Sequence, residues 1–331
     1  MLYLNKQTVT DLIDIKDSVA LIEDLMVKYE EGNYLMPNRL RITRQDHNYL
    51  YMPYFSDEVK GSKIQTIFPS NREHQQPAIQ GVVLLNNSES GKIECILDGS
   101  ILTSMRTAAV AAAGIKYTTP ETVESLGIIG AGIQSFYQVI FAVVMRPNIS
   151  KIYIYDLSDE ASYILKQKLI KIADDYASVA KLKDMEFILC DSSTDVVKQS
   201  ELIITATYSQ TPVIPNDPAL FEGKYFVGIG SYRPDMREYP DALFTHLKNA
   251  YTDVYYAREE SGDLIDPVDN GIFPANNIYT LGNVINGVVK PINTRRTTFF
   301  KVVGMAMFDV ELANMLYKIA IEKNRGQEMI E

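Results

Sequence analysis

Two patterns of hydrophobic and polar positions divide the chain at about Glu124. Before it, one amphipathic helix pattern is followed by short β-rich runs that Gly, Asn, Ser or Pro separate. The apolar positions of this helix recur at i, i+3 and i+4 spacing and a glycine follows them: Val19, Ile22, Leu25, Met26 and Gly32. The runs YLYMPYF, SKIQTIFP, IQGVVLL and KIECILD predict a sheet. An alanine-rich helix is expected to follow from about Leu102.

The second pattern alternates strand candidates with helices. SLGIIG is followed by the helix IQSFYQVIFAVVM and then by KIYIYD, MEFIL, ELIITAT, YFVGIG and AYTDVYY. Such alternation predicts a parallel sheet with right-handed crossovers and helices on both faces. The tail FFKVVGMAMFDVELANMLYKIAIEKN is predicted to be one long helix that returns to the first region. The predicted fold is therefore α/β, a Rossmann-type doubly wound parallel sheet (residues 119–304) inserted in a discontinuous α+β substrate-binding and dimerisation domain (residues 1–118 plus 305–331).

Composition and charge narrow the classes of function. The 331 residues carry a formal net charge of −10 and no dense cluster of Lys and Arg, which argues against nucleic acid or an anionic membrane as partner. The apolar run VIFAVVM is far shorter than the ~20 residues of a membrane span, and the N-terminus lacks a signal pattern, so a cytoplasmic protein is expected. Isolated cysteines and scattered histidines predict no disulfide framework and no metal site: Cys95, Cys190, His47, His74 and His246.

The stretch LGIIGAGIQS places a glycine-rich turn between a predicted strand and a predicted helix. In a dinucleotide-binding fold the first glycine permits a tight turn, the second lets the backbone approach the pyrophosphate, and a small third residue lets the helix pack closely. Gly130, Gly132 and Ser135 occupy these positions. The amides of the helix N-terminus would then face the phosphates. A purely structural turn is the alternative interpretation.

An acidic residue ends the next predicted strand. Asp156 closes IYIYD, at the distance from the glycines where a carboxylate meets the adenosine ribose of a dinucleotide. A carboxylate accepts hydrogen bonds from a 2′-hydroxyl and repels a 2′-phosphate, and no Arg follows in DLSDE. These features predict NAD as cofactor, with NADH favoured over NADPH. A solvated Asp at a strand end is the alternative.

Six segments together resemble a known family in their order along the chain. They are QGVVLLNNSESGKIECILDG, SMRTAAVAAAG, LGIIGAGIQS, IGSYRPDMRE, REESGD and FFKVVGMAMFD. Over nearly its full length the chain resembles the ornithine cyclodeaminase/mu-crystallin family, and RPDMRE with ESGD is more similar to the mu-crystallin branch, whose members reduce cyclic ketimines. The resemblance implies an NAD(P)-dependent oxidoreductase of small amino or imino acids. It also implies a homodimer whose first domain supplies the substrate site and the dimer interface.

Three cations correspond to the family's substrate-carboxylate cluster: Arg39, Lys63 and Arg106. A guanidinium fork suits an α-carboxylate, and further cations beside it favour an anionic ligand. Arg106 lies in an apolar, alanine-rich helix, where a buried charge needs a partner that a ligand carboxylate would supply. Lys63 lies among β-branched neighbours, where a lowered pKa would let it donate or accept the proton at the reacting centre. Taken singly, Arg39 and Lys63 would be interpreted as solvated surface charges; Arg106 is the exception because of its apolar helix.

The resemblance also implies a set of cofactor contacts. The glycine-rich turn supplies Gly130, Ala131, Gly132, Ile133 and Gln134, the adenosine ribose meets Asp156, and Thr107 lies near the phosphates. Further contacts follow later strands: Thr205, Ala206, Thr207, Gly228, Ile229, Gly230 and Ser231, with Lys301 and Gly304 closing the cleft. For the threonines, hydrogen bonding to backbone groups at strand ends is the alternative interpretation.

One departure from the family separates the possible activities. The cyclodeaminases carry an Asp where this chain has Tyr232, and a phenol with an ordinary pKa near ~10 is a poor base at neutral pH. Tyr232 is expected to contact the substrate, and Asp235 is close enough in sequence to act as a substitute base. The leading hypothesis is reduction of 1-pyrroline-2-carboxylate or 1-piperideine-2-carboxylate. Ornithine cyclodeamination, an alanine-type amino-acid dehydrogenase and a non-catalytic crystallin-like binder are the alternatives.

Overall fold

The computed structural model describes residues 1–74, 76–290 and 296–329. Contacts within the chain divide it into two compact units, Met1–Arg106 with Met305–Glu331 (unit 1) and Thr107–Gly304 (unit 2). The predicted insertion begins at residue 119, whereas the contacts begin unit 2 at Thr107, inside helix α3 (Gly99–Thr118). Helix α3 therefore contributes its first turns to unit 1 and the remainder to unit 2.

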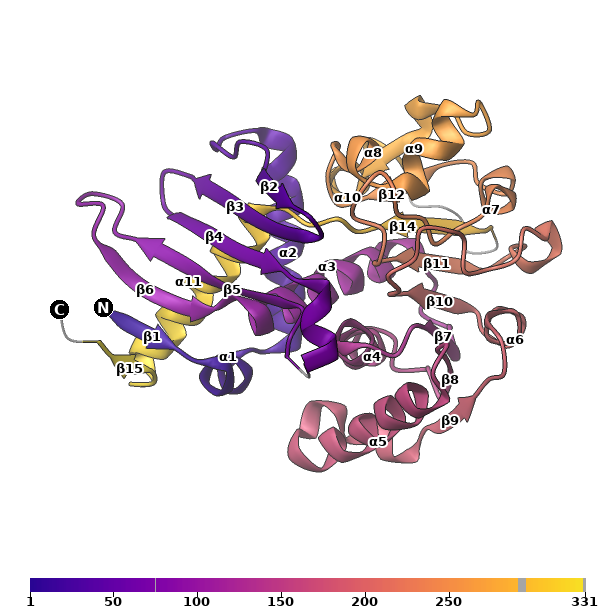
Figure 1. Ribbon diagram of the computed structural model, residues 1–331, viewed down its shortest axis with the longest axis horizontal. Coiled ribbons are helices and arrows are strands. Elements are labelled where there is room, and N and C mark those ends of the chain that lie inside the picture. The colour runs from indigo at the N-terminus through magenta and orange to yellow at the C-terminus, as the bar shows by residue number, and fades with distance from the viewer. Residues whose placement is uncertain (75, 291–295, 330–331) are drawn as a thin grey trace. The chain divides into compact units, whose positions relative to one another are not determined.

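Unit 1 is built on a seven-stranded sheet in the order β15-β1-β6-β5-β4-β3-β2 (Figure 1). Its strands are β1 (Leu2–Leu4), β2 (Leu40–Arg44), β3 (His47–Phe55), β4 (Lys60–Ile67), β5 (Ile79–Asn86), β6 (Ile93–Asp98) and β15 (Gln327–Glu328). Strands β2 to β6 form an antiparallel meander, so the four predicted runs are confirmed as β3 to β6. Strand β1 pairs parallel to β6, a long-range pairing that the short run at the N-terminus did not predict.

Helices cover one face of this sheet. They are α1 (Lys6–Leu12), α2 (Ile15–Glu31) and α11 (Ala306–Glu322), the last packed across β3, β4 and β5 (Figure 1). Helix α2 begins at the N-cap Asp14 and ends at Gly32, whose φ of 75° confirms the predicted glycine stop. Helix α11 lies close to the sheet, because a Cβ added to Gly61 would meet Val310 at 2.8 Å.

Unit 2 is an eight-stranded parallel sheet in the order β13-β12-β14-β11-β10-β7-β8-β9. Its strands are β7 (Ser125–Ile129), β8 (Lys151–Tyr155), β9 (Glu186–Leu189), β10 (Leu202–Thr205), β11 (Tyr225–Gly228), β12 (Ala250–Thr252), β13 (Ile278–Thr280) and β14 (Thr298–Lys301). One prediction is wrong here: the tail is not one helix, because residues 298–301 form a strand between β11 and β12, and α11 begins only at Ala306. A short, fully apolar segment is compatible with a buried strand as well as with a helix.

The strand order fixes where a ligand can bind unit 2. The chain runs outward from β7 to β9 and then returns to β10 on the other side of β7, which makes a topological switch point between β7 and β10. The helices of this unit, besides the rest of α3, are α4 (Ile133–Met145), α5 (Asp159–Asp175), α6 (Ser193–Gln199), α7 (Asp241–Thr245), α8 (Ala257–Glu260), α9 (Gly262–Asp269) and α10 (Leu281–Ile285). Among the described residues, no helix combines the length and the hydrophobicity needed to cross a bilayer.

Candidate functional site

The glycine-rich turn lies at the carboxyl end of β7, next to the switch point. Gly130 has a φ of 94°, and a Cβ there would lie 2.8 Å from the carbonyl oxygen of Ala206, so only glycine fits. The Ser135 hydroxyl is fully buried and donates to the Gly130 carbonyl at 2.5 Å. Ser135 thus takes the third small position and binds the turn to helix α4.

At Gly132, by contrast, no contact within the protein requires a glycine. Its φ is an ordinary −81°, and an added Cβ would meet no protein atom within 4 Å. It is the N-cap of α4 without a side-chain cap, so the first amides of this helix remain open to an anion. In the same turn, Ile133 is exposed and the buried Oε1 of Gln134 has no hydrogen-bond partner in the described part of the chain. The open amides fit the pyrophosphate of a dinucleotide.

Asp156 follows β8, directly beside the glycine-rich turn. Its Oδ2 accepts a hydrogen bond of 2.7 Å from the amide of Ala131, and its Oδ1 accepts one of 3.0 Å from the amide of Ser158. The carboxylate is half-buried and has further lone pairs for a ribose diol. The structure thus brings the predicted glycines and the predicted acid together at one edge of the sheet.

The segments after β10 and β11 adjoin the same edge. Ala206 donates its amide to the carbonyl of Ile129 at 2.9 Å, and Ile229 donates its amide to the carbonyl of Thr205 at 2.9 Å. The hydroxyl of Thr205 is fully buried and donates a hydrogen bond to the hydroxyl of Tyr239. The turn Gly228–Ser231 therefore lies beside Thr205–Thr207, as two consecutive parallel strands require.

Other predicted cofactor residues have internal partners. Lys301 ends β14 with its side chain fully buried and its Nζ 3.2 Å from Asp263 Oδ2. Gly304 has a φ of 81° and donates its amide to Asp253 at 2.6 Å. Thr107 is buried on α3 directly after Arg106. Direct contact of these residues with a cofactor stays a prediction, as does substrate contact by the half-buried Tyr232.

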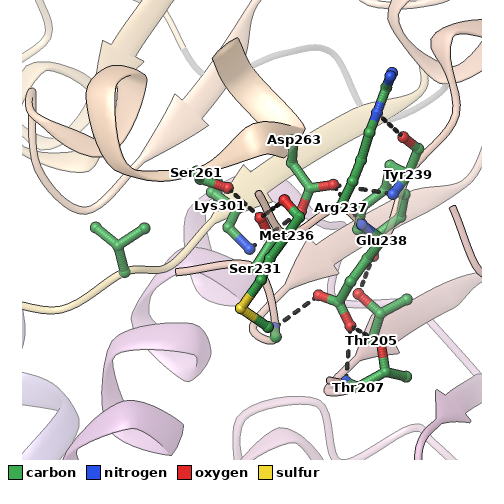
Figure 2. Close-up of polar contacts among 12 residues, drawn as sticks. Thr205, Thr207, Ser231, Met236, Arg237, Glu238, Tyr239, Ser261, Asp263 and Lys301 are labelled. Carbon is green, nitrogen blue, oxygen red and sulfur yellow. Dashed lines mark hydrogen bonds and ion pairs between the residues drawn. The ribbon is translucent and has the colours of Figure 1, made fainter. Parts of the chain in front are cut away.

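A carboxylate that sequence analysis missed, Glu238, organises these segments (Figure 2). It is fully buried, and it accepts hydrogen bonds from the amide and the hydroxyl of Thr207 and from the amide of Gly230. Burial raises the pKa of Glu238, and the nearby Lys301 charge opposes that increase. The acid was a usable signal, because it lies inside RPDMRE, one of the motifs on which the family resemblance rests.

Unit 1 contains the second cluster, in which two predicted cations share one carboxylate. Asp309, near the start of α11, accepts hydrogen bonds on Oδ1 from Lys63 Nζ at 2.9 Å and from Arg106 Nε at 3.1 Å. Lys63 projects from β4 and Arg106 from α3, and all three side chains are buried. Arg106 makes this bond through Nε rather than through a terminal nitrogen. Arg39, directly before β2, is close enough for its charge to affect Lys63.

The electrostatics of this cluster give Lys63 an unusual pKa. Burial is the largest cause and lowers the pKa of Lys63 to about 8; Asp309 opposes this decrease, while Arg106 and Arg39 add to it. For Asp309, burial favours the neutral acid, but Arg106 and Lys63 outweigh burial and lower the pKa of the carboxyl. Lys63 is therefore charged at neutral pH and close to the point at which it releases its proton.

Asp309 was not among the predicted site residues. Arg106 was expected to need a ligand carboxylate as its partner, and the structure supplies a protein carboxylate first. The same argument would have identified Asp309, since it is an acid within the apolar segment VVGMAMFDV. Its second oxygen, Oδ2, is buried without a hydrogen-bond partner among the described residues. Within the same residues, no group of His, Cys, Asp and Glu side chains could hold a metal ion.

Comparison with known proteins finds relatives that match nearly the whole chain. The chain is 29% identical to the Delta(1)-pyrroline-2-carboxylate reductase of Bacillus cereus over 338 residues, which cover 99% of each protein. Its fold matches that of the Thermococcus litoralis Delta(1)-pyrroline-2-carboxylate reductase in complex with NADH and L-proline, with a TM-score of 0.91, 26% identity, and coverage of 99% of this chain and 100% of that one.

A more distant structure shares the fold alone. An archaeal alanine dehydrogenase dimer with bound NAD matches with a TM-score of 0.88 and 22% identity, over 100% of this chain and 99% of that one. The family model described as "Ornithine cyclodeaminase/mu-crystallin family" matches residues 2–324, nearly the whole chain. The protein therefore belongs to the ornithine cyclodeaminase/mu-crystallin family.

Proposed function

We propose that this protein reduces a cyclic ketimine, 1-pyrroline-2-carboxylate or 1-piperideine-2-carboxylate, to the corresponding cyclic amino acid with NADH. The observation that carries the proposal is the buried cluster of Lys63, Arg106 and Asp309, which joins a carboxylate-binding cation to a lysine close to its titration point. The Bacillus cereus and Thermococcus litoralis relatives are named for reduction of a cyclic imine of this kind, which supports the same chemistry.

Each residue of the cluster answers one requirement of the reaction. The terminal nitrogens of Arg106, with Arg39 beside them, suit a planar carboxylate, because a guanidinium fork matches its geometry. Lys63 in its charged form donates the proton to the ring nitrogen as the C=N carbon gains a hydride. Asp309 keeps Lys63 charged and fixes its direction. The balance is one hydride to carbon and one proton to nitrogen, which turns the imine into an amine and NADH into NAD⁺.

The residues that hold the cofactor lie in unit 2. NADH supplies the hydride when bound; the open amides at Gly132 receive its pyrophosphate and the carboxylate of Asp156 accepts from its adenosine ribose. A 2′-phosphate would meet the negative charge of Asp156, with two more acids, Asp159 and Glu160, in the first turn of α5. We therefore propose that NADH is preferred over NADPH.

Two enzymatic alternatives differ from this proposal in their redox balance. An ornithine cyclodeaminase would return the hydride and release ammonia without net use of cofactor, and Tyr232 stands where that activity has an acid. An amino-acid dehydrogenase would reduce an open-chain imine formed from a keto acid and ammonia. A crystallin-like binder would retain the cofactor fold and catalyse nothing.

One assay series separates all four. We expect NADH oxidation with 1-pyrroline-2-carboxylate or 1-piperideine-2-carboxylate, and slower or no oxidation with pyruvate plus ammonia. Ornithine with NAD⁺ is run in parallel for ammonia release. Turnover of ornithine to proline with no turnover of either cyclic imine would reject the proposal, and so would binding of NADH without oxidation in every arm.

We also propose that the protein is a homodimer through the sheet of unit 1. Helix α11 packs against the face that carries Gly61 and Lys63, so the alternate positions of the strands form the opposite face. Register places a group of apolar side chains there: Leu40, Ile42, Tyr49, Tyr51, Ile64, Val82, Leu84 and Ile96. The first four are more than a third exposed. A continuous apolar sheet face of this kind favours burial against a second copy.

A further inference from the structure

We propose that Glu238 is a positioning residue whose carboxylate holds the segments after β10 and β11 in the conformation that receives the nicotinamide half of the cofactor. The inference rests on the proposed NADH-dependent function. It concerns a residue that need not touch cofactor or substrate, since its side chain is fully buried. Its partners are the two segments themselves.

The geometry shows how one carboxylate joins both segments (Figure 2). Oε1 of Glu238 accepts from the Thr207 amide at 2.7 Å and from the Thr207 hydroxyl at 2.8 Å, while Oε2 accepts from the Gly230 amide at 2.7 Å. A Cβ on Gly230 would lie 2.6 Å from Oε1 of Glu238, so glycine is needed for the carboxylate to approach. The two amide bonds have the short distances typical of ionised acceptors.

The bonds to Glu238 lie just beyond the last backbone hydrogen bonds of β10 and β11. The last ladder bonds at this edge are those of the Ala206 and Ile229 amides, and the next segments leave their strands. Without the carboxylate, the Thr207 and Gly230 amides would lose their hydrogen-bond acceptor at this point. Glu238 thus fixes the conformation of the two segments that follow these strands.

A second layer holds Glu238 in place. Oδ1 of Asp263 accepts from the Glu238 and Tyr239 amides at 2.7 and 3.0 Å, while its Oδ2 faces Lys301 Nζ at 3.2 Å. Ser231 is fixed in the same region, because its hydroxyl donates to the Met236 carbonyl at 2.6 Å. The Lys301 ammonium offsets part of the charge of two buried carboxylates.

The glycine-rich turn is held by different groups. Asp156 and Ser135 fix the Gly130–Gly132 turn, and neither bonds to Glu238. ADP-ribose, which keeps both phosphates and both riboses and lacks only the nicotinamide ring, therefore depends mainly on the first set of contacts. Intact NADH depends on both sets. The two ligands separate a positioning role of Glu238 from a general loss of fold.

The chain offers a matched control at the opposite end of the same sheet. Glu201, directly before β10, accepts hydrogen bonds from the amides of Glu124 and Ser125 and from the hydroxyl of Ser125. It therefore makes the same kind of contact as Glu238, two amides and one hydroxyl, but at the amino ends of the strands. At Glu238, where both oxygens accept, a glutamine keeps one acceptor and presents an NH₂ to a former donor; at Glu201 all three bonds fall on Oε2, so the oxygen of a glutamine can keep them.

The experiment compares Glu238→Gln with Glu201→Gln in the full-length protein. We expect Glu238→Gln to weaken NADH binding and to lower kcat by ~10²-fold, the effect of a reactant displaced by about 1 Å, while ADP-ribose affinity stays unchanged. Glu201→Gln, which can keep its three bonds, should leave NADH affinity and kcat unchanged. The milder Thr207→Val, which removes one of the three bonds, should reproduce the NADH effect in part and serves if Glu238→Gln does not fold.

Two results would overturn the inference. One is a Glu238→Gln variant that keeps the parental NADH affinity and kcat; the other is a variant that loses NADH and ADP-ribose affinity equally, as a structural defect would. The binding measurements need no imine, so they decide the role of Glu238 even if the substrate differs from the one proposed. Failure of the parent protein to oxidise NADH with any imine would instead count against the proposed function.

Discussion

At the scale of single residues, Lys63 and Arg106 meet on one oxygen of Asp309 in an otherwise apolar interior. A buried cation without a partner would lose its charge or destabilise the fold by several kcal/mol. A shared carboxylate keeps both cations charged, yet burial still lowers the pKa of Lys63 to about 8. A lysine in this state holds a proton at neutral pH and releases it readily, as a general acid must.

The first prediction concerns the pH dependence of reduction. Lys63 donates only when protonated, so kcat/KM for the imine should fall as pH rises through about 8. In the Lys63→Met variant this decrease (the alkaline limb of the pH profile) should disappear. Turnover should be lower by ~10²–10⁴-fold, with NADH affinity retained. The measurement is a pH–rate profile from steady-state kinetics. A parental profile that stays flat through this range would contradict the assignment of Lys63.

Asp309→Asn sharpens the same prediction. Removing the negative charge removes the largest influence that raises the pKa of Lys63, so the limb should move to lower pH. Glu311→Gln is the control: Glu311 lies on the same helix and accepts from Tyr54 and Lys28, outside the Lys63 cluster. It should lower stability and leave the limb in place. A shift of equal size in both variants would show that Asp309 acts only through the fold.

A second prediction concerns cofactor choice. Asp156→Ser removes the carboxylate that repels a 2′-phosphate and that binds the Ala131 amide. We expect NADH affinity to fall ~10-fold, about 1.4 kcal/mol, and NADPH affinity to fall less or to rise. Fluorescence titration with both cofactors measures the ratio. Equal affinity of the parent protein for NADH and NADPH would be incompatible with the role given to Asp156.

Residue patterns predicted some of this chemistry and not the rest. Gly130, Gly132 and Asp156 were identifiable because their spacing along a strand–turn–helix–strand unit is fixed by local geometry. Asp309 and Glu238 were missed: their place in an apolar segment or a recognised motif was a signal, but their donors come from other segments and no spacing rule names those donors. A buried acid shows its function only when folding brings the donors to it.

At the scale of elements, β14 illustrates how a central strand is mistaken for a helix. Its four residues are all buried, as strands in the middle of a parallel sheet usually are, so they show no alternation of polar and apolar positions. The segment then continues into α11 with further apolar residues, and one helix seemed to span both. The glycine at residue 304, with its φ of 81°, marks the true boundary between strand and helix.

The third prediction concerns how helix α3 ends. The guanidinium of the buried Arg146 donates to the carbonyls of Ile115, Lys116 and Thr119, each at 2.8 Å, and so binds the last carbonyls of this helix. Arg146→Met should destabilise the protein by about 2–4 kcal/mol, because buried carbonyls lose their donor. Urea unfolding measures the loss. Arg325→Met, which breaks an exposed pair with Asp11, should cost about 0–1 kcal/mol; equal losses would reject the prediction.

At the scale of the whole molecule, the alternation of strands and helices after Glu124 was enough to predict a doubly wound sheet, because parallel strands need crossover helices. The boundary of unit 2 was harder to predict from the sequence, because α3 runs through it without interruption. Unit 1 has a sheet with helices on one face and an apolar opposite face. That asymmetry is the physical basis for the proposed homodimer.

The fourth prediction tests this dimer. The protein should be a dimer at micromolar concentration by light scattering, and Ile64→Lys, which places a charge in the middle of the apolar face, should yield monomers. Tyr163→Lys changes an exposed aromatic residue on α5 of unit 2 and should leave the dimer intact. A monomeric parent protein, or a dimer that survives Ile64→Lys, would contradict the proposal.

The central claim is that hydride passes from NADH to the imine carbon of a cyclic ketimine. The most direct test supplies 1-pyrroline-2-carboxylate with NADH deuterated at both C4 positions and analyses the product by mass spectrometry and NMR. We expect proline with one deuterium at Cα, formed in equal amount with NAD⁺, and far less of this labelled proline from Lys63→Met in the same time at neutral pH. Proline without deuterium, or NADH consumed without formation of proline, would contradict it.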